Sequence, residues 1–191
     1  MIVLGLTGSI GMGKSTTAAM FREAGVPVHD SDEAVHRLYR GAAVPLIEAD
    51  FPGTTAGGVV DRELLAKQVL GNPAALKRLE AIVHPLVRAD AEAFLERHRS
   101  AGAPVAVLDI PLLFETGAER EFDSIFCVAC SAPTQRERLR TRGWTDEQIQ
   151  QRRAAQIPVE EKMLRAHPAI WTEGAMDVHA QQVHRPVPAA R

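Results

Sequence analysis

The sequence predicts an α/β protein with a doubly wound, five-stranded parallel sheet. Near-continuous apolar runs, typical of strands that are covered on both faces, recur along the chain, and a helical pattern follows the first of them. The composition agrees, because 46% hydrophobic and 24% charged residues with a net charge of -2 are ordinary for a globular protein of 191 residues. A chain of this length can bury roughly two-thirds of its unfolded surface.

The first elements predicted are a strand, a helix and a second strand. Residues 2–6 form an apolar run that ends at Thr7-Gly8, and residues 15–24 are good helix formers followed by Gly25, a typical helix stop. Residues 26–29 then indicate a second short strand. This order is that of a strand-loop-helix-strand unit in a parallel sheet.

Residues 33–101 are predicted to form a helical insertion, because helical patterns follow one another there without a convincing strand between them. Asp61 can cap one helix, and Asn72-Pro73 can start another. We expect His84-Pro85 to break that helix and a further one to run to about Ser100.

Sequences typical of buried strands occur again at residues 105–109 and 125–129, and Ala169-Ile170-Trp171 can form the fifth strand. An Arg-rich stretch with a capping-box pattern between Thr145 and Gln148 precedes that last strand. We expect a single domain over residues 1–191 with four kinds of segment. These are a core at about 1–32, 102–135 and 166–184, a helical insertion at about 33–101, a lid at about 136–165 and a frayed tail at about 185–191.

Several classes of protein are disfavoured. Cys127 and Cys130 cannot form the disulfide framework of a secreted protein, and residues three apart on a strand point to opposite faces, so we interpret both as packing residues. No apolar run approaches the ~20 residues that span a bilayer, and the first residues carry no secretory pattern. We therefore expect a cytoplasmic protein with no membrane partner. The net charge is not the strongly basic one that is typical of proteins that bind nucleic acid, so we expect no nucleic-acid partner. We expect a monomer, and an oligomer is not excluded.

Residues 8–15, Gly8-Ser9-Ile10-Gly11-Met12-Gly13-Lys14-Ser15, match G-x-x-x-x-G-K-[ST] between a predicted strand and a helix. In this P-loop motif the glycines let successive N–H groups point at phosphate oxygens, and the lysine reaches the β/γ phosphates. The serine hydroxyl is expected to bind Mg²⁺. The motif predicts a site for a nucleoside triphosphate at Gly8, Gly11, Met12, Gly13, Lys14, Ser15 and Thr16.

The remaining motifs narrow the class of nucleotide-binding protein. A GTPase would read guanine with Asn-Lys-x-Asp, and the single asparagine, Asn72, precedes Pro73. A motor or AAA-type ATPase would place Glu after the acid that ends its second nucleotide strand, whereas Asp109 is followed by Ile110. Small-molecule kinases remain.

Asp30-Ser31-Asp32 lies at the end of the second predicted strand, where a P-loop kinase must deprotonate an acceptor hydroxyl. A carboxylate there can accept the proton and hold the hydration shell of Mg²⁺. The alternative is structural, because Ser31 or Asp32 can also cap the helix that follows.

Taken together, these motifs resemble those of the dephospho-CoA kinase family. The resemblance spans about residues 2–165. It rests on residues 6–15, Asp30-Ser31-Asp32, His84-Pro85-Leu86, residues 109–115 with the block Pro111-Leu112-Leu113-Phe114-Glu115, Gln135-x-x-Arg138 followed by Arg142, Arg152-x-x-x-Gln156 and Lys162.

The resemblance implies a P-loop kinase fold and ATP-dependent phosphorylation of the ribose 3′-hydroxyl of dephospho-CoA, the last step of coenzyme A synthesis. It implies that Asp32 is the general base, that Lys14 grips the phosphates of ATP and that Asp30 is a supporting acid. His84, Pro85, Leu112, Leu113 and Glu115 would lie around the acceptor, and each has a structural alternative: a helix break, core packing, or a pair between Glu115 and an arginine of the lid.

Arg138 and Arg142 match the arginines of the family's lid. They are four residues apart and share a helix face, so we expect both to contact ATP and Arg142 to act in catalysis, while Arg136 and Arg140 are surface charges. The chain departs from the family pattern at Thr172-Glu173-Gly174, which contains no asparagine. Adenine must be held there by backbone groups or by Glu173.

Two alternatives stay open at this point. Another nucleoside or small-metabolite kinase would share the P-loop and the lid but have a different acceptor pocket. A non-catalytic ATP-binding module is the other, although intact Lys14, Ser15 and Asp32 argue against it.

Overall fold

The computed structural model describes residues 1–184, and the predicted frayed tail lies outside the described residues. The chain divides into two compact units, one made of Met1–His29 and the chain from His98 onward, the other of Asp30–Arg97. Each unit has a hydrophobic core of its own.

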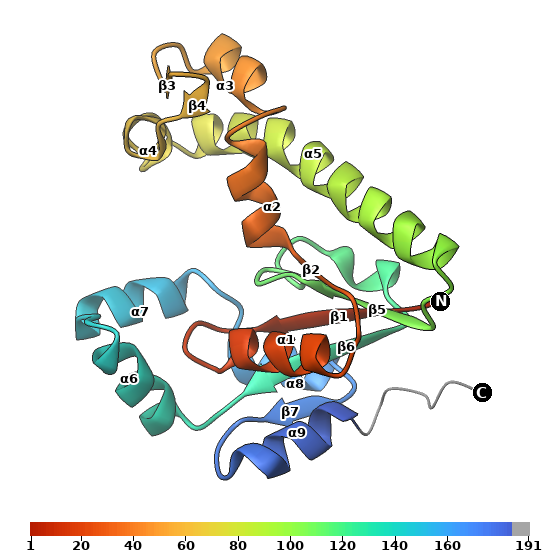
Figure 1. Cartoon of the computed structure of the whole chain (residues 1–191). Coiled ribbons are helices and arrows are strands. Elements are labelled where there is room, and N and C mark those ends of the chain that lie inside the picture. Colours follow the sequence, from red (N-terminus) through yellow and green to blue (C-terminus); the bar gives the residue numbers. More distant parts are fainter. Residues whose placement is uncertain (185–191) are drawn as a thin grey trace. The chain divides into compact units, whose positions relative to one another are not determined.

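The first unit contains a five-stranded sheet in the order β2-β5-β1-β6-β7 (Figure 1). The strands are β1 (Ile2–Gly8), β2 (Val28–Asp30), β5 (Val105–Asp109), β6 (Ser124–Ala129) and β7 (Ala169–Trp171). β1 pairs in parallel with both β5 and β6, and β6 pairs in parallel with β7. The predicted five-stranded parallel sheet is confirmed, and the P-loop lies where the central strand β1 ends.

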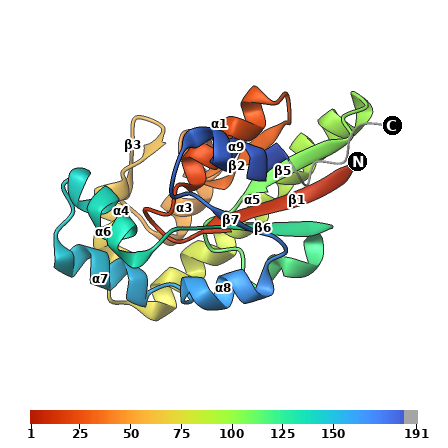
Figure 2. The same ribbon diagram turned by 90° about the horizontal axis from the view of Figure 1, so that it is seen from below.

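Helices cover both faces of this sheet, so it is doubly wound. Those of the first unit are α1 (Lys14–Glu23), the short 3₁₀ helix η1 (Ala118–Glu121), α6 (Ala132–Thr141), α7 (Asp146–Ala154), α8 (Val159–Arg165) and α9 (Met176–His184). Figure 2 shows α1 and α9 on one side of the sheet and α8 on the other.

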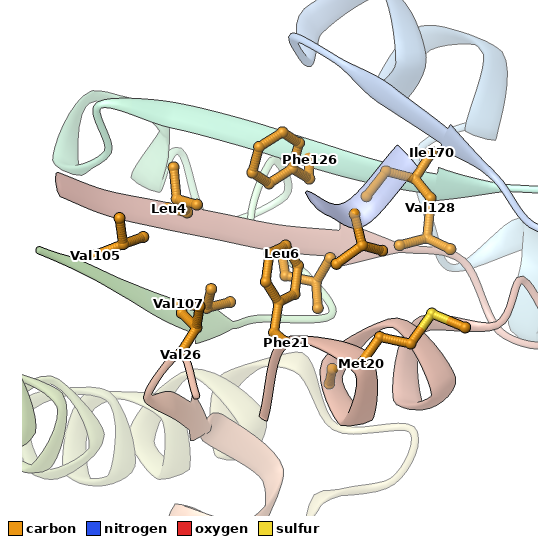
Figure 3. Close-up of a cluster of buried hydrophobic side chains, with 12 residues drawn as sticks. Leu4, Leu6, Met20, Phe21, Val26, Val105, Val107, Phe126, Val128 and Ile170 are labelled. Atoms are coloured by element: carbon orange, nitrogen blue, oxygen red, sulfur yellow. The ribbon is translucent and has the colours of Figure 1, made fainter. Parts of the chain in front are cut away.

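The two faces of the sheet have separate cores because successive residues of a strand point to opposite sides. Leu6 and Phe126 pack with Phe21 of α1, and the rings of Phe21 and Phe126 lie 6.1 Å apart (Figure 3). On the other face Ile125 and Cys127 pack with Leu113. The strands are therefore buried on both faces, as their near-continuous apolar sequences predict.

The second unit is mainly helical. Its elements are α2 (Ser31–Leu38), α3 (Val44–Asp50), β3 (Thr55–Ala56), β4 (Val59–Val60), α4 (Arg62–Val69) and most of α5 (Pro73–Ser100). Its core contains Ile47, Phe51, Leu65 and Val83. As predicted, the Asp61 carboxylate caps α4 by accepting from the backbone of Glu63 and Leu64, and α5 begins at Pro73.

Two predictions for this unit are wrong. It contains an antiparallel hairpin, β3-β4, where no strand was expected. Gly57 and Gly58 both have positive φ, 59° and 76°, which suits a tight hairpin turn, and strands of two residues are too short to give a sequence pattern.

His84-Pro85 does not break a helix, because α5 is continuous from Pro73 to Ser100 with Pro85 in its interior. Inside a helix, proline removes one backbone donor and its ring crowds the carbonyl four residues earlier. Val83, Leu86 and Val87 pack on the core of the second unit at this point. This packing outweighs the local preference of proline.

Candidate active site

The loop between β1 and α1 has the conformation that its glycines predict. Gly11 and Gly13 have φ of 73° and 96°, which side chains disfavour. A Cβ at Gly11 would lie 2.8 Å from Leu139, and one at Gly13 would lie 3.1 Å from Thr172. The first turn of α1 has no side-chain cap and no acidic residue, so its N-terminus keeps the positive end of the helix dipole for an anion.

Lys14 lies beside the carboxylate of Asp109, which ends β5. The Lys14 Nζ is 2.5 Å from Asp109 Oδ1, and the two side chains are 16% and 1% exposed. The register of the sheet sets this pair, because Leu6 of β1 lies opposite Asp109. A buried carboxylate thus holds the ammonium at the phosphate-binding loop.

A cavity of about 410 Å³ opens next to the loop in the first unit. Gly13 and Thr16 contribute from the P-loop and α1, Arg138 and Arg142 from α6 and its C-terminus, and the remaining walls are Glu137, Thr141, Thr172, Met176 and His179. The structure therefore brings Arg138 and Arg142 to one cavity, together with two of the predicted nucleotide-binding residues.

The two other arginines of this helix lie elsewhere. Arg140 pairs with Asp146 at 2.5 Å, and both side chains are at least half exposed. Arg136 is exposed and lines a different hollow together with Asp146.

Arg138 donates two hydrogen bonds to Thr172, which follows β7. Its Nη1 donates to Thr172 Oγ1 and its Nη2 donates to the Thr172 carbonyl, both at 2.8 Å. The Thr172 hydroxyl also lies 2.7 Å from the Met12 carbonyl of the phosphate-binding loop. Arg138 thus braces the loop from one wall of the cavity.

The Glu173 carboxylate accepts hydrogen bonds from residues at the N-terminus of α6. It accepts from the Ser131 hydroxyl at 2.5 Å, from the Ser131 backbone N–H at 3.2 Å and from the Thr134 hydroxyl. These hydrogen bonds lower the pKa of Glu173. Of the two groups expected to hold adenine, the carboxylate already has partners, which leaves the backbone.

Glu115 pairs with a lysine rather than with an arginine of the lid. Its Oε1 lies 2.7 Å from Lys162 Nζ and accepts from the Ile157 backbone N–H at 3.0 Å. Lys162 is fully buried and Glu115 is 16% exposed. The other carboxylate oxygen, Oε2, is buried without a hydrogen-bond partner.

The two leucines that precede Glu115 have different environments. Leu113 is fully buried in the core on the α8 side of the sheet, whereas Leu112 is 42% exposed. Of the pair, Leu112 is the side chain that a ligand can reach.

The candidate residues of the second unit lie at two of its helices, α2 and α5. Asp30, at the end of β2, is the N-cap of α2, because its Oδ1 accepts from the backbone of Asp32 at 2.9 Å and of Glu33 at 3.1 Å. The structural alternative for Ser31 and Asp32 as caps is therefore wrong. Asp32 is exposed in the first turn of α2, and His84 and Pro85 are exposed on α5.

Five residues of the site were not predicted from the sequence as functional: Asp109, Gln135, Lys162, Thr172 and His179. Asp109 could have been found, since a charged residue at the carboxyl end of a strand next to the P-loop strand faces the phosphate site. His179 and Thr172 gave no signal, because their roles depend on β7 and α9 folding back behind the loop. Cys127 and Cys130 are free and buried, as predicted, and burial raises the pKa of Cys127 to about 11.

A loop of this kind binds phosphate in many proteins, so the rest of the site must identify the class. Here arginines from the helix after β6 wall the cavity beside the loop, and the signatures of GTPases and AAA-type ATPases are missing. The fold and the site together define a P-loop kinase of small molecules.

Comparisons with known proteins identify the family. The dephospho-CoA kinase family model matches residues 2–177. A dephospho-CoA kinase of Mesorhizobium japonicum is 66% identical over 163 residues, 85% of this chain and 83% of that protein. One from Rhodopseudomonas palustris is 53% identical over all of this chain and 96% of its own. A Thermus thermophilus crystal structure has a TM-score of 0.86 at 37% identity, covering 96% of this chain and 95% of that one.

The chain belongs to the dephospho-CoA kinase family. It is therefore an enzyme, a kinase with ATP as co-substrate and a small molecule as acceptor. Family membership decides against the non-catalytic ATP-binding module. No helix within residues 1–184 is both long and apolar enough to cross a membrane.

Proposed function

We propose that this chain transfers the γ-phosphoryl group of ATP to the ribose 3′-hydroxyl of dephospho-CoA, giving coenzyme A and ADP. The observation that carries the proposal is the family match over residues 2–177. The P-loop, the Lys14–Asp109 pair and the cavity lined by arginines provide the parts that such a transfer needs.

The phosphates of ATP bind at the P-loop and the N-terminus of α1. Gly8, Gly11, Met12 and Gly13 of the loop and the first turn of α1 at Ser15 and Thr16 surround them, and the Met12 N–H closes the loop by donating to the Ser9 carbonyl at 3.2 Å. Lys14 neutralises charge on the transferring group, and Asp109 keeps the ammonium at the loop.

The nucleoside occupies the cavity beside the loop. Arg138 and Arg142 provide positive charge and planar guanidinium groups, and Met176 provides apolar contact. Backbone groups near Gly174 contact adenine, since the Glu173 carboxylate is held by Ser131 and Thr134. Arg142, whose guanidinium is exposed, contacts the transferring phosphoryl group.

The Ser15 hydroxyl and the phosphates would hold Mg²⁺ at the same place, with Asp109 as a further oxygen donor. No group of three His, Cys, Asp or Glu able to hold a metal occurs within residues 1–184. This set fits Mg²⁺ nonetheless, because in kinases the ion takes one or two protein oxygens and completes its shell with water and phosphate. The ion supplies charge neutralisation between the β- and γ-phosphates.

The acceptor hydroxyl is deprotonated by Asp32. Because Asp30 serves as the cap of α2, the carboxylate of Asp32 is not needed for the helix. Asp30 supports it, and the second unit, with His84 and Pro85 exposed on α5, binds the acceptor. In the first unit, Leu112 and Glu115 bind the acceptor, and Leu113 supports them from the core.

Residues 136–165 act as the lid of the site. They include most of α6 and all of α7 and α8, and they bring Arg138 and Arg142 to the nucleotide. Closure of such a segment excludes water from the transferring group.

The test is ADP release by the purified protein with and without dephospho-CoA, compared with a panel of nucleosides. We expect dephospho-CoA to stimulate ADP release far more than any nucleoside. Lys14→Ala should abolish the stimulation, whereas the exposed Lys67→Ala on α4 should not alter it. Stimulation by a nucleoside but not by dephospho-CoA would refute the acceptor assignment, and normal turnover by Lys14→Ala would refute the role of the P-loop.

A further inference from the structure

Four consecutive carbonyl groups of the phosphate-binding loop each face a buried side chain, three of them from distant parts of the chain and one, Thr17, from α1. The contacts are Gln135 Nε2 to the Ile10 oxygen (2.7 Å), Cys130 Sγ to the Gly11 oxygen (3.9 Å), Thr172 Oγ1 to the Met12 oxygen (2.7 Å) and Thr17 Oγ1 to the Gly13 oxygen (3.2 Å). The thiol is a weak donor, and the other three groups donate ordinary hydrogen bonds.

These contacts determine where the N–H groups of the loop point. In a trans peptide the carbonyl and the N–H of the next residue lie on opposite sides. When the carbonyls of Ile10, Met12 and Gly13 are held against the protein, the N–H groups of Gly11, Gly13 and Lys14 are directed away from it. This is the arrangement that cradles an anion.

Two of the donors are themselves fixed. The Thr172 hydroxyl accepts from Arg138, so its own proton is available for the Met12 carbonyl at 2.7 Å, which is closer than the Ala129 carbonyl at 3.3 Å. Thr17 lies 2.9 Å from His179 Nε2. In the tautomer of His179 that is protonated at Nε2, His179 donates to the Thr17 hydroxyl, whose own proton then points to the Gly13 carbonyl.

Helix α6 holds the loop at two points. Gln135 bonds directly to the Ile10 carbonyl, and Arg138, one turn later, acts through Thr172 on the Met12 carbonyl. Gln135 is 1% exposed, so its amide has no role at the surface. It does not line the cavity that contains Arg138 and Arg142, although it lines a second hollow together with Ser9 and Met12 of the loop.

We propose that Gln135 and Thr172 are positioning residues that hold the phosphate-binding loop in its anion-binding conformation before nucleotide binds. The proposal rests on the proposed function, because it requires the loop to bind the phosphates of ATP. Without either donor, a carbonyl of the loop loses its partner and the peptide can rotate toward water. The apparent dissociation constant then rises by the inverse of the fraction of molecules that keep the competent loop.

The test compares Gln135→Leu with Gln182→Leu by calorimetric titration with ADP and with dephospho-CoA. Gln182 is the matched control, because its amide bonds to the backbone of Trp171 and Val178 and to no carbonyl of the loop. We expect Gln135→Leu to raise the Kd for ADP about tenfold, equal to about 1.4 kcal/mol, with the Kd for dephospho-CoA unchanged. Gln182→Leu should change neither constant.

If Gln135→Leu does not fold, a second pair of variants at Thr172 tests the same inference. Thr172→Ser keeps the hydroxyl and should bind ADP like the wild type, whereas Thr172→Val should bind it about tenfold more weakly. Equal ADP affinity in the wild type, Gln135→Leu and Thr172→Val would overturn the inference and leave the proposed function standing. Failure of the wild type to bind ADP would instead overturn the proposed function.

Discussion

The buried pair between Lys162 and Glu115 gives a prediction whose size follows from the structure. Lys162 is fully buried, and its ammonium lies 2.7 Å from the carboxylate. Lys162→Met keeps most of the side-chain volume and leaves Glu115 with the Ile157 N–H as its remaining protein donor, since Oε2 already lacks a partner. Removing one partner of a buried pair costs about 3–5 kcal/mol.

The lower end of that range applies, because Glu115 is 16% exposed and can recover some hydration. A loss of about 3 kcal/mol corresponds to a fall in Tm of about 6–12 °C for a protein of this size. Differential scanning calorimetry of Lys162→Met measures it. Arg140→Met is the control, since the Arg140–Asp146 pair is at least half exposed and its loss should hardly change Tm.

The double variant Lys162→Met/Glu115→Gln shows whether the stability of Lys162→Met is lost through the unpaired charge of Glu115 or through lost packing. Glutamine keeps an oxygen for the Ile157 N–H but carries no charge, so the double variant should recover most of the Tm lost by Lys162→Met. A double variant as unstable as Lys162→Met, or a change in Tm below about 2 °C in Lys162→Met, would refute the reasoning.

Three further results are expected. Asp32→Asn should lower kcat about 10²–10⁴-fold with unchanged thermal unfolding, and activity within threefold of the wild type would contradict its role as base. Arg142→Ala should lower kcat more than Arg140→Ala in steady-state assays, because only Arg142 lines the nucleotide cavity, and equal losses would contradict this. Glu173, whose pKa is lowered by its hydrogen bonds, stabilises the fold above pH 4.5, its ordinary value, and this contribution is lost as pH falls through the lowered pKa. The Tm advantage of the wild type over Glu173→Gln should shrink across that range, and a constant difference would contradict it.

The sheet and most caps could be predicted because their causes are local. Apolar runs at 105–109 and 125–129 are strands buried on both faces, and Thr145 with Gln148 forms the capping box that its spacing predicts. The errors occur where tertiary packing outweighs local preference. Pro85 remains inside α5 because Val83 and its neighbours bury the helix around it.

The cap of α2 shows a different limit of sequence reasoning. Three polar residues, Asp30, Ser31 and Asp32, can each cap a helix, and a shift of one residue in the start of the helix changes which of them does. The observed cap is Asp30. This choice has a functional consequence, because it leaves the side chain of Asp32 outside the capping interaction and available for chemistry.

The phosphate-binding loop shows why half of a site can be predicted from a motif and the other half cannot. The motif specifies the glycines and Lys14, and these residues shape the side of the loop whose N–H groups face phosphate. Nothing local specifies the carbonyl side, because Gln135 lies 125 residues from Ile10 and Thr172 lies 160 residues from Met12. Gln135 follows β6 and Thr172 follows β7, and in the sheet β6 lies beside β1 and β7 beside β6. The geometry of the loop therefore depends on segments that are distant in the sequence, and we expect the loss of the Gln135 or Thr172 side chain to weaken nucleotide binding without any change in the motif.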